Sequence, residues 1–420
     1  MTHHYCKKYM KTRLEQYSKE DHGIFQKDID SDVFFISDIL INNGYQAFVV
    51  GGCIRDILLG KEPKDFDIAT DASPSEICKL FSHAKIIGRR FKIVHVYVNE
   101  KKYFEVSTFR SDIKSKTNQK KFKKTQGMIK RDNVFGTISQ DAFRRDFTIN
   151  SLYLDLDSEI LYDYVNGVHD IKEKKIRSIK KPSVSYQEDP VRMLRAIRFE
   201  SKLGLKLTND CKESIIKMSH LINNVSPYRL FDEILKIMHS GNGERGYKEL
   251  KKTNLFKCLF PYTYKILENN EIYNEFFTLA LRNTDLRINK GMHVNPSFIY
   301  AVFLWPYFLE EDEKESKGID ESFKRTIGSQ NKYIAIPDFF QSTIFTIWSL
   351  QSSFLNLSKR NIQYLTSFSK FRAAYDFFHI RSLIDKDLRK FSDEWYEIQK
   401  DVKSKKIIKG KNHYGNRKSK

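Results

Sequence analysis

FVVGGCIRDILLGKEPKDFDIAT, residues 48–70, brings together an apolar run, a glycine pair, a short charged segment and two closely spaced aspartates. The apolar residues ahead of the glycines predict a strand, and CIRDILLG predicts a short helix that ends at Gly60. KDFDIAT, residues 64–70, predicts a second strand. Strand and helix signals go on alternating until about residue 165, so the first part of the chain is expected to contain both a sheet and helices.

The two aspartates of this stretch raise a chemical question. Residues i and i+2 of a strand share a face, so Asp65 and Asp67 are expected to project together while Phe66 and Ile68 face the core. Two like charges side by side are unfavourable unless a cation lies between them. Mg²⁺ suits such a pair, because it takes one or two carboxylates and completes its shell with water and substrate phosphates. Solvated charges are the alternative.

A third carboxylate is expected nearby. FKIVHVYVN and KKYFEVSTF predict two strands joined in a hairpin around residues 99–101. Glu105 alternates with Phe104 and Val106, so it faces away from the core. A carboxylate beside a metal pair could act as a ligand or as a general base for an attacking hydroxyl. An exposed strand glutamate without a function is the alternative.

Glycine and arginine residues around these strands indicate anion binding. Gly51 and Gly52 allow a backbone to approach an anion closely, and Arg55 lies one turn into the following helix, where it could reach the same anion. RRDFTINSLYLD places Arg145 and Asp146 just ahead of an apolar segment. A plain turn and a surface charge cluster are the alternatives for these two motifs.

EDPVRMLRAIRF, residues 188–199, predicts a helix with Asp189 at its N-cap and Pro190 at its first position. Its apolar residues fall on one face, and Arg192, Arg195 and Arg198 fan across the other. Asp189 and Arg192 offer an acceptor and a planar donor fork, which can read the edge of a base. A solvated arginine face is the alternative.

The composition limits the partners. The 420 residues include 73 Lys+Arg and 53 Asp+Glu, a formal net charge of +20. This surplus indicates a polyanionic partner, which could be RNA, DNA or an anionic membrane. We see no run of about 18 uncharged apolar residues, so no membrane span is expected. Five cysteines without a CxxC motif indicate reduced thiols and a cytoplasmic location.

The rest of the chain reads differently. A lysine-rich loop or insertion is expected over residues 111–134, and helical periodicity dominates from about residue 170. The aromatic residues there are expected to form the core. The last twenty residues form a basic tail that is expected to be disordered.

Several of these motifs, in the same order, resemble those of class II nucleotidyltransferases, the bacterial poly(A) polymerases and CCA-adding enzymes. They are VVGGCIRDILLGKEPKDFDIAT, RRDFTINSL and EDPVRMLRAIRF. Three further segments look like the poly(A) polymerase versions: IIGRRFKIVHV (86–96), PYRLFDEILKIMHSGNG (227–243) and FSKFRAAYDFFHIRSLI (368–384). The likeness covers about residues 20–265 and 330–400.

The resemblance implies an α+β fold, in which a nucleotidyltransferase head with a small mixed β-sheet and flanking helices precedes all-α neck and body domains. The expected parts are the catalytic head (1–165), a helical neck that binds the nucleotide base and RNA (166–265), a helical RNA-binding body (266–400) and the tail (401–420).

The resemblance also implies roles for single residues. Asp65 and Asp67 would bind two Mg²⁺ ions, for which Mn²⁺ could substitute, and Glu105 or Asp146 would be the third catalytic carboxylate. The implied nucleotide-binding residues are Gly51, Gly52, Arg55, Arg145, Asp146, Asp189, Arg192 and Arg195. Among them Gly52 and Arg55 would contact the triphosphate, and Asp189, Arg192 and Arg195 would form the template for the base.

The implied activity is template-independent addition of AMP from ATP to RNA 3′ ends with release of pyrophosphate, as in mRNA polyadenylation. The expected partners are ATP and RNA 3′ ends, and the chain is expected to be a monomer. Addition of CCA or A to tRNA remains an alternative, because both activities share the head and neck motifs. A non-catalytic RNA-binding protein on the same scaffold is a further alternative, which the intact Asp65 and Asp67 pair disfavours. A membrane-surface protein lacks an amphipathic anchor.

Overall fold

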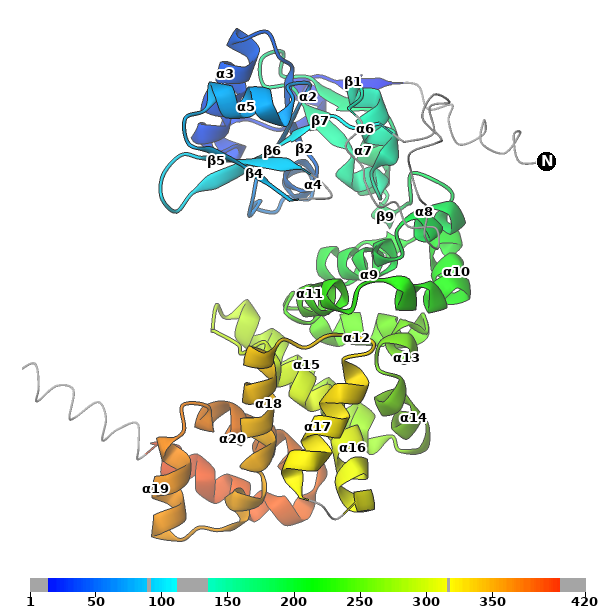
Figure 1. The fold of residues 1–420 in the computed structure, drawn as a ribbon. Coiled ribbons are helices and arrows are strands. Elements are labelled where there is room, and N and C mark those ends of the chain that lie inside the picture. The colour runs from blue at the N-terminus through cyan, green and yellow to red at the C-terminus, as the bar shows by residue number, and fades with distance from the viewer. Residues whose placement is uncertain (1–13, 89–91, 112–134, 316–317, 401–420) are drawn as a thin grey trace, which may run out of the picture. The chain divides into compact units, whose positions relative to one another are not determined.

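The computed structural model describes residues 14–88, 92–111, 135–315 and 318–400. The chain divides into two compact units, residues 1–224 and 225–420 (Figure 1). Residues 112–134 of the expected lysine-rich loop, the basic tail and residues 89–91 of the motif at 86–96 lie outside the described residues. The domain boundaries expected at residues 165 and 265 stay predictions.

The first unit is built on an eight-stranded sheet with the strand order β1-β8-β7-β2-β3-β6-β5-β4. Strands β3 and β6 pair in parallel, whereas the other neighbours pair antiparallel, so the sheet is mixed. The strands are β1 (Glu15–Tyr17), β2 (Ala47–Val50), β3 (Asp67–Thr70), β4 (Ala84–Ile87), β5 (Ile93–Tyr97), β6 (Tyr103–Thr108), β7 (Leu152–Leu154) and β8 (Leu161–Asp163).

The opening stretch of sequence forms the centre of this sheet. Every residue of β2 is buried, and the strand ends at Gly51, whose φ of 82° lies in the left-handed region that favours glycine. Helix α4 (Gly52–Leu58) follows at once, and β3 returns beside β2. The expected strand, turn, helix and strand are confirmed. However, β3 begins at Asp67, so Asp65 lies just ahead of the strand, and Phe66 is only partly buried.

Helices cover the two faces of the sheet unequally. In Figure 1, α3 (Ser31–Asn42) and α5 (Pro74–Leu80) lie on one side of the strands and α4 lies on the other. Helix α5 begins with the expected capping box, in which the hydroxyl of Ser73 accepts from the backbone N–H of Glu76 and the Glu76 carboxylate accepts from that of Ser73. The expected β5–β6 hairpin is also confirmed.

Short helices complete the first unit. In chain order, the remaining elements are α2 (Lys19–His22), η1 (Gln26–Asp28), α6 (Ile138–Arg144), η2 (Thr148–Asn150), α7 (Gly167–Lys172), α8 (Pro182–Glu188), α9 (Val191–Leu203), α10 (Asn209–Met218) and η3 (Ser219–Asn224). A two-stranded parallel pair, β9 (Lys175–Ile176) with β10 (Lys206–Leu207), lies among them.

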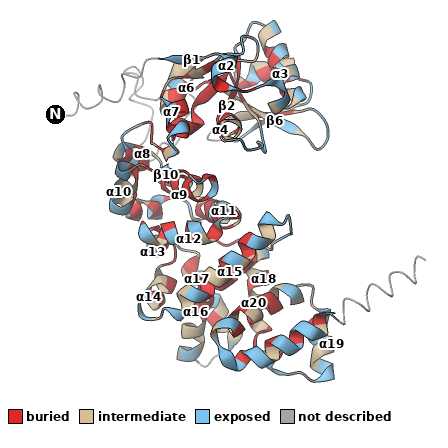
Figure 2. Cartoon of the chain, turned by 180° about the vertical axis from the view of Figure 1, so that it is seen from behind, coloured by how far each residue is buried: buried red, intermediate tan, exposed pale blue. Residues whose placement is uncertain are grey.

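Helix α9 differs in one detail from the expectation. It begins at Val191 with Pro190 as its N-cap, so Asp189 lies one position further out. The Asp189 carboxylate still accepts from the backbone N–H of Val191 at 3.3 Å, so it caps the first turn from there. Asp189 is at the same time the C-cap of α8, which ends at Glu188. Buried residues, red in Figure 2, run through β2 and α9, as the apolar periodicity predicts.

The described part of the second unit is helical. Its elements are α11 (Pro227–Met238), α12 (Gly243–Lys252), α13 (Leu255–Leu259), α14 (Pro261–Asn269), α15 (Ile272–Asn289), α16 (Ser297–Glu315), α17 (Ile319–Gln330), α18 (Asp338–Ser349), η4 (Ser352–Leu355), α19 (Lys359–Ser367), α20 (Phe371–Ile384), η5 (Lys386–Leu388) and a helix over residues 389–400.

Aromatic residues form much of the core of this second unit. Phe277 and Phe303 are fully buried with ring centroids 5.1 Å apart, and Trp395 is buried against Phe354. The expectation that these residues are core is confirmed for them. No helix among the described residues is long and apolar enough to cross a membrane. The expected α+β architecture is confirmed, with the β9–β10 pair as an addition to its helical part.

Candidate active site

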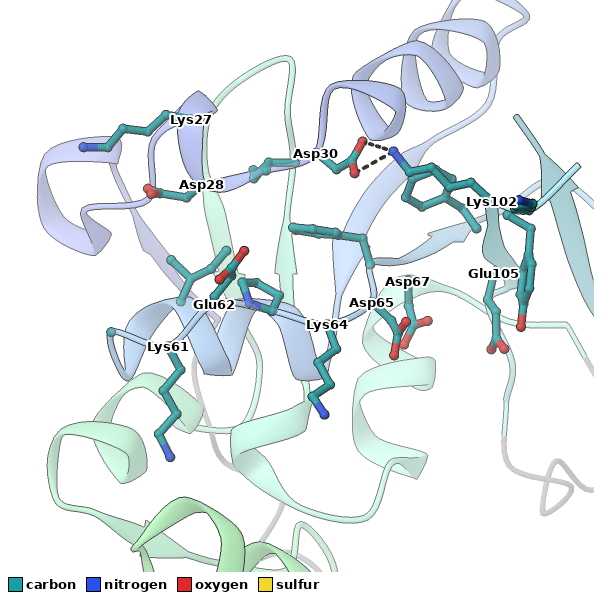
Figure 3. A pocket seen from close by; sticks show the side chains of 18 residues that line it. Lys27, Asp28, Asp30, Lys61, Glu62, Lys64, Asp65, Asp67, Lys102 and Glu105 are labelled. Carbon is teal, nitrogen blue, oxygen red and sulfur yellow. Dashed lines mark hydrogen bonds and ion pairs between the residues drawn. The ribbon is translucent and has the colours of Figure 1, made fainter. Parts of the chain in front are cut away.

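Three carboxylates extend to the same side of the sheet where its two parallel strands are paired (Figure 3). Asp67 is the first residue of β3 and pairs in register with Glu105 of β6, so their side chains leave the same face of the sheet. Figure 3 shows the carboxylates of Asp65, Asp67 and Glu105 extending to the same side. They line a groove that is formed by residues 27–30, 60–67 and 101–105. The two aspartates and Glu105 therefore line one groove, and their catalytic roles stay predictions.

The surroundings of Asp67 make its charge unfavourable. Burial raises the pKa of Asp67, the neighbouring Glu105 and Asp65 carboxylates raise it further, and the guanidinium of Arg145 opposes them. The outcome is a pKa of about 6. A carboxylate that holds its proton this firmly, beside two other acids, lies where a bound cation would be most stabilising.

We tested whether these residues fit a divalent metal. Among the described residues, no three His, Cys, Asp or Glu side chains lie close enough to form a closed metal cage. An open site fits the oxygen donors of Asp65 and Asp67, because Mg²⁺ binds through one or two carboxylates and takes its remaining ligands from water and phosphates. The donor set and the raised pKa of Asp67 therefore fit a metal that arrives with a phosphate substrate.

The glycine turn lies beside an arginine. A Cβ atom on Gly51 would lie 3.3 Å from Nη1 of Arg145, so the backbone and the guanidinium are closely packed there. Arg145 Nη1 also donates to the carbonyl oxygen of Asn150 at 3.4 Å. The same arginine lowers the pKa of Asp67, so its positive charge favours the ionised form of that carboxylate. The glycine turn, the Arg145 guanidinium and the Asp67 carboxylate thus belong to the same region of the first unit.

Two buried side chains hold this arginine. Arg145 Nε donates to the Asp141 carboxylate at 3.0 Å and to the hydroxyl of Tyr153 at 2.9 Å, and that hydroxyl donates to Asp141 at 2.7 Å. Burial by itself raises the pKa of Asp141, but the guanidinium groups of Arg145 and Arg144 reverse this and lower it. The closed triangle of hydrogen bonds fixes the orientation of Arg145.

Asp146 takes part in a different network. Its Oδ2 accepts from Nε and Nη2 of Arg195, each at 2.6 Å, and its Oδ1 accepts from the side chain of Asn150 at 3.2 Å. Burial raises the pKa of Asp146, yet Arg195 and Arg192 outweigh it and lower the pKa to about 2. Asp146 therefore remains ionised and points to α9.

Arg55 lies beneath the glycine turn. Its guanidinium donates to Asp56 from Nε and Nη2, at 2.8 and 2.7 Å, and Nη1 donates to the side chain of Asn150. Only 5% of Arg55 is exposed, and it lies over the ring of Phe199. Part of its hydrogen-bonding capacity is therefore used within the protein, and contact with an anion stays a prediction.

Arg192 is also anchored. Its Nη1 donates to the hydroxyl of Ser185 at 2.9 Å, and its Nη2 donates to the carbonyl oxygen of Arg144 at 3.0 Å. The Oε2 atom of Glu188 lies 3.6 Å from Nη1 of Arg192. These bonds connect α9 to the segment that carries Arg145 and Asp146, so the motifs at 144–152 and 188–199 belong to one site.

Comparison with known proteins identifies the family. The sequence model described as "Poly A polymerase head domain" matches residues 47–177, that described as "Probable RNA and SrmB-binding site of polymerase A" matches 204–267, and that described as "Polymerase A arginine-rich C-terminus" matches 311–420. Poly(A) polymerase I of Salmonella typhi is 38% identical over 395 residues, which cover 91% of this chain and 85% of that protein. The chain belongs to the poly(A) polymerase family.

Other members of the wider class are also similar. Poly(A) polymerase I of Haemophilus influenzae is 36% identical over 90% of this chain and 86% of its own, and the CCA-adding enzyme of Bacillus subtilis is 32% identical over 83% and 84%. A CCA-adding enzyme solved with ATP has a TM-score of 0.65 at 20% identity, with 97% and 89% of the two chains covered. The Thermotoga maritima CCA-adding enzyme with tRNA has a TM-score of 0.60 at 20% identity, with 90% and 86% covered. These structures share the fold.

Sequence reasoning missed part of the site of this poly(A) polymerase family member. Asn150 bonds to both Asp146 and Arg55, and Asp141 and Tyr153 hold Arg145. Asn150 gave one signal, since it is a polar residue inside the otherwise apolar run FTINSLYL. Asp141 gave the other, because it lies one helical turn before Arg145. Nothing in the sequence around Tyr153 indicates that its hydroxyl would bond to Arg145.

Proposed function

We propose that this protein is a polynucleotide adenylyltransferase that adds AMP from ATP to RNA 3′ ends without a template and releases pyrophosphate. The observation that carries the proposal is the register of β3 with β6, which sets Asp67 opposite Glu105 beside the Gly51 turn and Arg145. Family membership and the basic composition support RNA as the acceptor.

The triphosphate of ATP would lie against the glycine turn. The Gly51 N–H donates to the carbonyl oxygen of Leu152 at 3.2 Å, so the backbone N–H of Gly52 and the guanidinium of Arg145 would bind the phosphates that leave as pyrophosphate. Bound by Asp65 and Asp67, two Mg²⁺ ions, or Mn²⁺ in their place, would neutralise the triphosphate and activate the RNA 3′-hydroxyl. Arg55 would support the turn from below.

Glu105 is the better candidate for the third catalytic carboxylate. It lies in register with Asp67 and half-exposed, so it can accept or hold the proton of an attacking hydroxyl. Asp146 is buried and paired with Arg195, which suits a positioning role toward the sugar and the base site.

Recognition of the base would fall to the start of α9. Arg192 is held by Ser185 and a backbone carbonyl, so its fork is fixed while it can still share its remaining donors. Together with Asp189 it would offer an edge of donors and an acceptor that matches one base better than another. Arg195 would act through Asp146.

The second unit supports RNA binding by its charge. A groove between α15 and α20 consists of two hollows that share Arg287 and Arg372; His293 and Lys370 line one of them, and Lys290 lines the other. Asp376 pairs with both arginines, so the lysines supply most of the net positive charge. Such a groove would bind the phosphate backbone without sequence preference and with strong salt dependence. A monomeric, cytoplasmic enzyme with a role in mRNA polyadenylation remains our proposal for its setting.

An extension assay tests this function. The protein is incubated with Mg²⁺ and a non-tRNA oligonucleotide, with ATP or CTP offered separately, and in parallel with a tRNA that lacks its CCA end. Long tails on the oligonucleotide with ATP alone support the proposal. Incorporation of CTP confined to the truncated tRNA would instead favour CCA addition. Asp65→Ala should abolish extension in either case and leave RNA binding largely intact, which also tests the non-catalytic alternative.

A further inference from the structure

A row of paired residues crosses the sheet on the face that carries the carboxylates. Register places Asp67 of β3 opposite Glu105 of β6, Glu105 opposite His95 of β5, and His95 opposite Lys85 of β4. Residues paired in this way share one face of a sheet. The next pair along the same face is Tyr97 with Tyr103. The strand face beyond Glu105 is therefore aromatic and cationic.

The rings on this face are stacked, and Tyr103 is the accessible one, because the His95 side chain is only 14% exposed and its Nε2 lies 3.6 Å from Oε1 of Glu105. His95 and Tyr103 lie parallel, with centroids 4.2 Å apart and planes at 12°, and Tyr97 lies 5.5 Å from Tyr103. Nζ of Lys85 lies 5.6 Å from the centroid of Tyr97. Tyr103 is 46% exposed, whereas the alternate residues of β5 and β6 are buried on the opposite face.

Cross-strand aromatic pairs also stabilise hairpins, by about 0.2–1 kcal/mol, which is the ordinary explanation for such rings. Two features go beyond it here. Tyr103 lines the same groove as Asp65, Asp67 and Glu105, and Lys85 and Tyr97 line a second hollow immediately beyond the hairpin. The rings thus extend from the carboxylates outward as a continuous surface.

The chemistry of the reaction gives this surface a direction. In phosphoryl and nucleotidyl transfer, the attacking and leaving oxygens lie roughly in line on opposite sides of the phosphorus. The glycine turn and Arg145, which would bind the leaving pyrophosphate, follow β2 on one side of Asp67. The attacking 3′-hydroxyl must then arrive from the other side, across β6 and β5, about 5–10 Å away at the usual strand spacing.

We infer that Tyr103, supported by the His95 ring stacked on it and continued by Tyr97, forms the subsite that stacks the 3′-terminal bases of the acceptor RNA, with Lys85 at its outer end toward a backbone phosphate. The inference rests on the proposed function, because it assumes that an RNA 3′ end is the acceptor. Stacking suits this task, since every base has a π-face and an enzyme without a template must accept the end it has just made.

The ligand is therefore single-stranded RNA with a free 3′-hydroxyl, held by its bases and not by a sequence-specific edge. Removal of an aromatic ring should weaken RNA binding and leave ATP binding unaltered. The reason is that the glycine turn and Arg145, which would bind the triphosphate, lie on the opposite side of the carboxylates. Stacking contributions measured by alanine substitution correspond to about 5-fold to 150-fold in affinity per base.

The variant test uses Tyr103→Ala, with Tyr103→Phe to keep the ring. Phe35→Ala is the matched control, since Phe35 is an exposed aromatic residue of the same unit, on α3, at 59% exposure. Each variant is assayed for KM of an RNA oligonucleotide, KM of ATP and Kd of the oligonucleotide. Tyr103→Ala should raise the RNA KM and Kd at least about 5-fold with the ATP KM unchanged, and the other two should stay within about twofold. An unchanged RNA KM and Kd in Tyr103→Ala overturns the inference.

An RNA-side test needs no stable variant. Oligonucleotides that are abasic at the 3′-terminal position keep every phosphate and the 3′-hydroxyl but lose one stacking partner. The unmodified protein should bind this RNA more weakly than RNA that is abasic ten positions upstream, and Tyr103→Ala should lose less on the same change. Equal penalties at the two positions overturn the inference. Absence of ATP-dependent extension by the unmodified protein overturns the proposed function instead, so the two failures are distinct.

Discussion

The guanidinium of Arg195 binds the carboxylate of Asp146 through two hydrogen bonds of 2.6 Å, and so connects α9 to the segment that follows α6. Family resemblance assigned Arg195 to the base and Asp146 to nucleotide binding or catalysis. Their pairing indicates that the two act as one unit, in which the buried carboxylate depends on the arginine for its charge. Burial raises the pKa of Asp146, and the arginines lower it to about 2.

Arg195→Ala should therefore destabilise the first unit strongly. Breaking a buried ion pair typically costs about 3–5 kcal/mol, and the cost here should fall toward the lower end because Arg192 and Asn150 also stabilise the Asp146 charge. Asp146→Asn in the same chain removes that charge, so the double variant should be more stable than Arg195→Ala alone. Denaturant unfolding of both single variants and the double variant measures the coupling. Strictly additive losses would show that the pair contributes little.

Asp67→Asn should abolish extension yet stabilise the metal-free protein above pH 6. Folded Asp67 keeps its proton up to about pH 6, whereas the unfolded chain releases it near pH 3.8. The folded state binds more protons between these values, so the free energy of unfolding falls as the pH rises through this window. The full penalty, about 3 kcal/mol, is present above pH 6 and absent below pH 3.8.

Thermal unfolding with a chelator at pH 4 and pH 8 tests this prediction. The melting temperature of Asp67→Asn should exceed that of the unmodified protein at pH 8 and approach it at pH 4. Asp71→Asn serves as a control, because Asp71 is an exposed aspartate just beyond the same strand. A gain of equal size at both pH values would mean that the Asp67 carboxylate is not strained by its neighbours.

Tyr153→Phe should weaken ATP binding through Arg145. The phenol accepts from Arg145 and donates to Asp141, so its loss opens the triangle that orients the guanidinium. Loss of a hydrogen bond to a charged group is worth about 1.5–3 kcal/mol, so we expect the ATP KM to rise about 10-fold or more. The RNA KM should not change. Tyr162→Phe is the control, because Tyr162 packs against the same hydrophobic cluster. An equal rise in the ATP KM of Tyr162→Phe would show that Tyr153 does not act through Arg145.

The central fold of this chain could be predicted because its signals are local. The apolar run at 47–50, the glycine turn and the capping box at Ser73 each determine an element within a few residues. Asp67 and Glu105 could be oriented for the same reason, since alternation alone gives the face of a strand.

The partners of these residues could not be predicted, because they depend on contacts between distant segments. The parallel pairing of β3 with β6 joins segments 38 positions apart at Asp67 and Glu105, and no pattern in either strand specifies it. The same is true of Arg195 with Asp146. Asp65 was predicted to lie within the strand, whereas the chain bends at Lys64 and β3 begins only at Asp67.

Lysines of the groove between α15 and α20 should contribute to RNA affinity by charge alone. Lys370 lines one of the two hollows of this groove and Lys290 lines the other, and each neutralised phosphate of a single strand contributes about −0.7 to the slope of log K against log salt. Lys290→Ala with Lys370→Ala should weaken RNA binding at low salt and reduce the slope by about 1.4. Lys265→Ala, an exposed lysine of α14, is the control. Fluorescence anisotropy over a salt series measures both quantities, and an unchanged slope in the double variant would place the RNA backbone elsewhere.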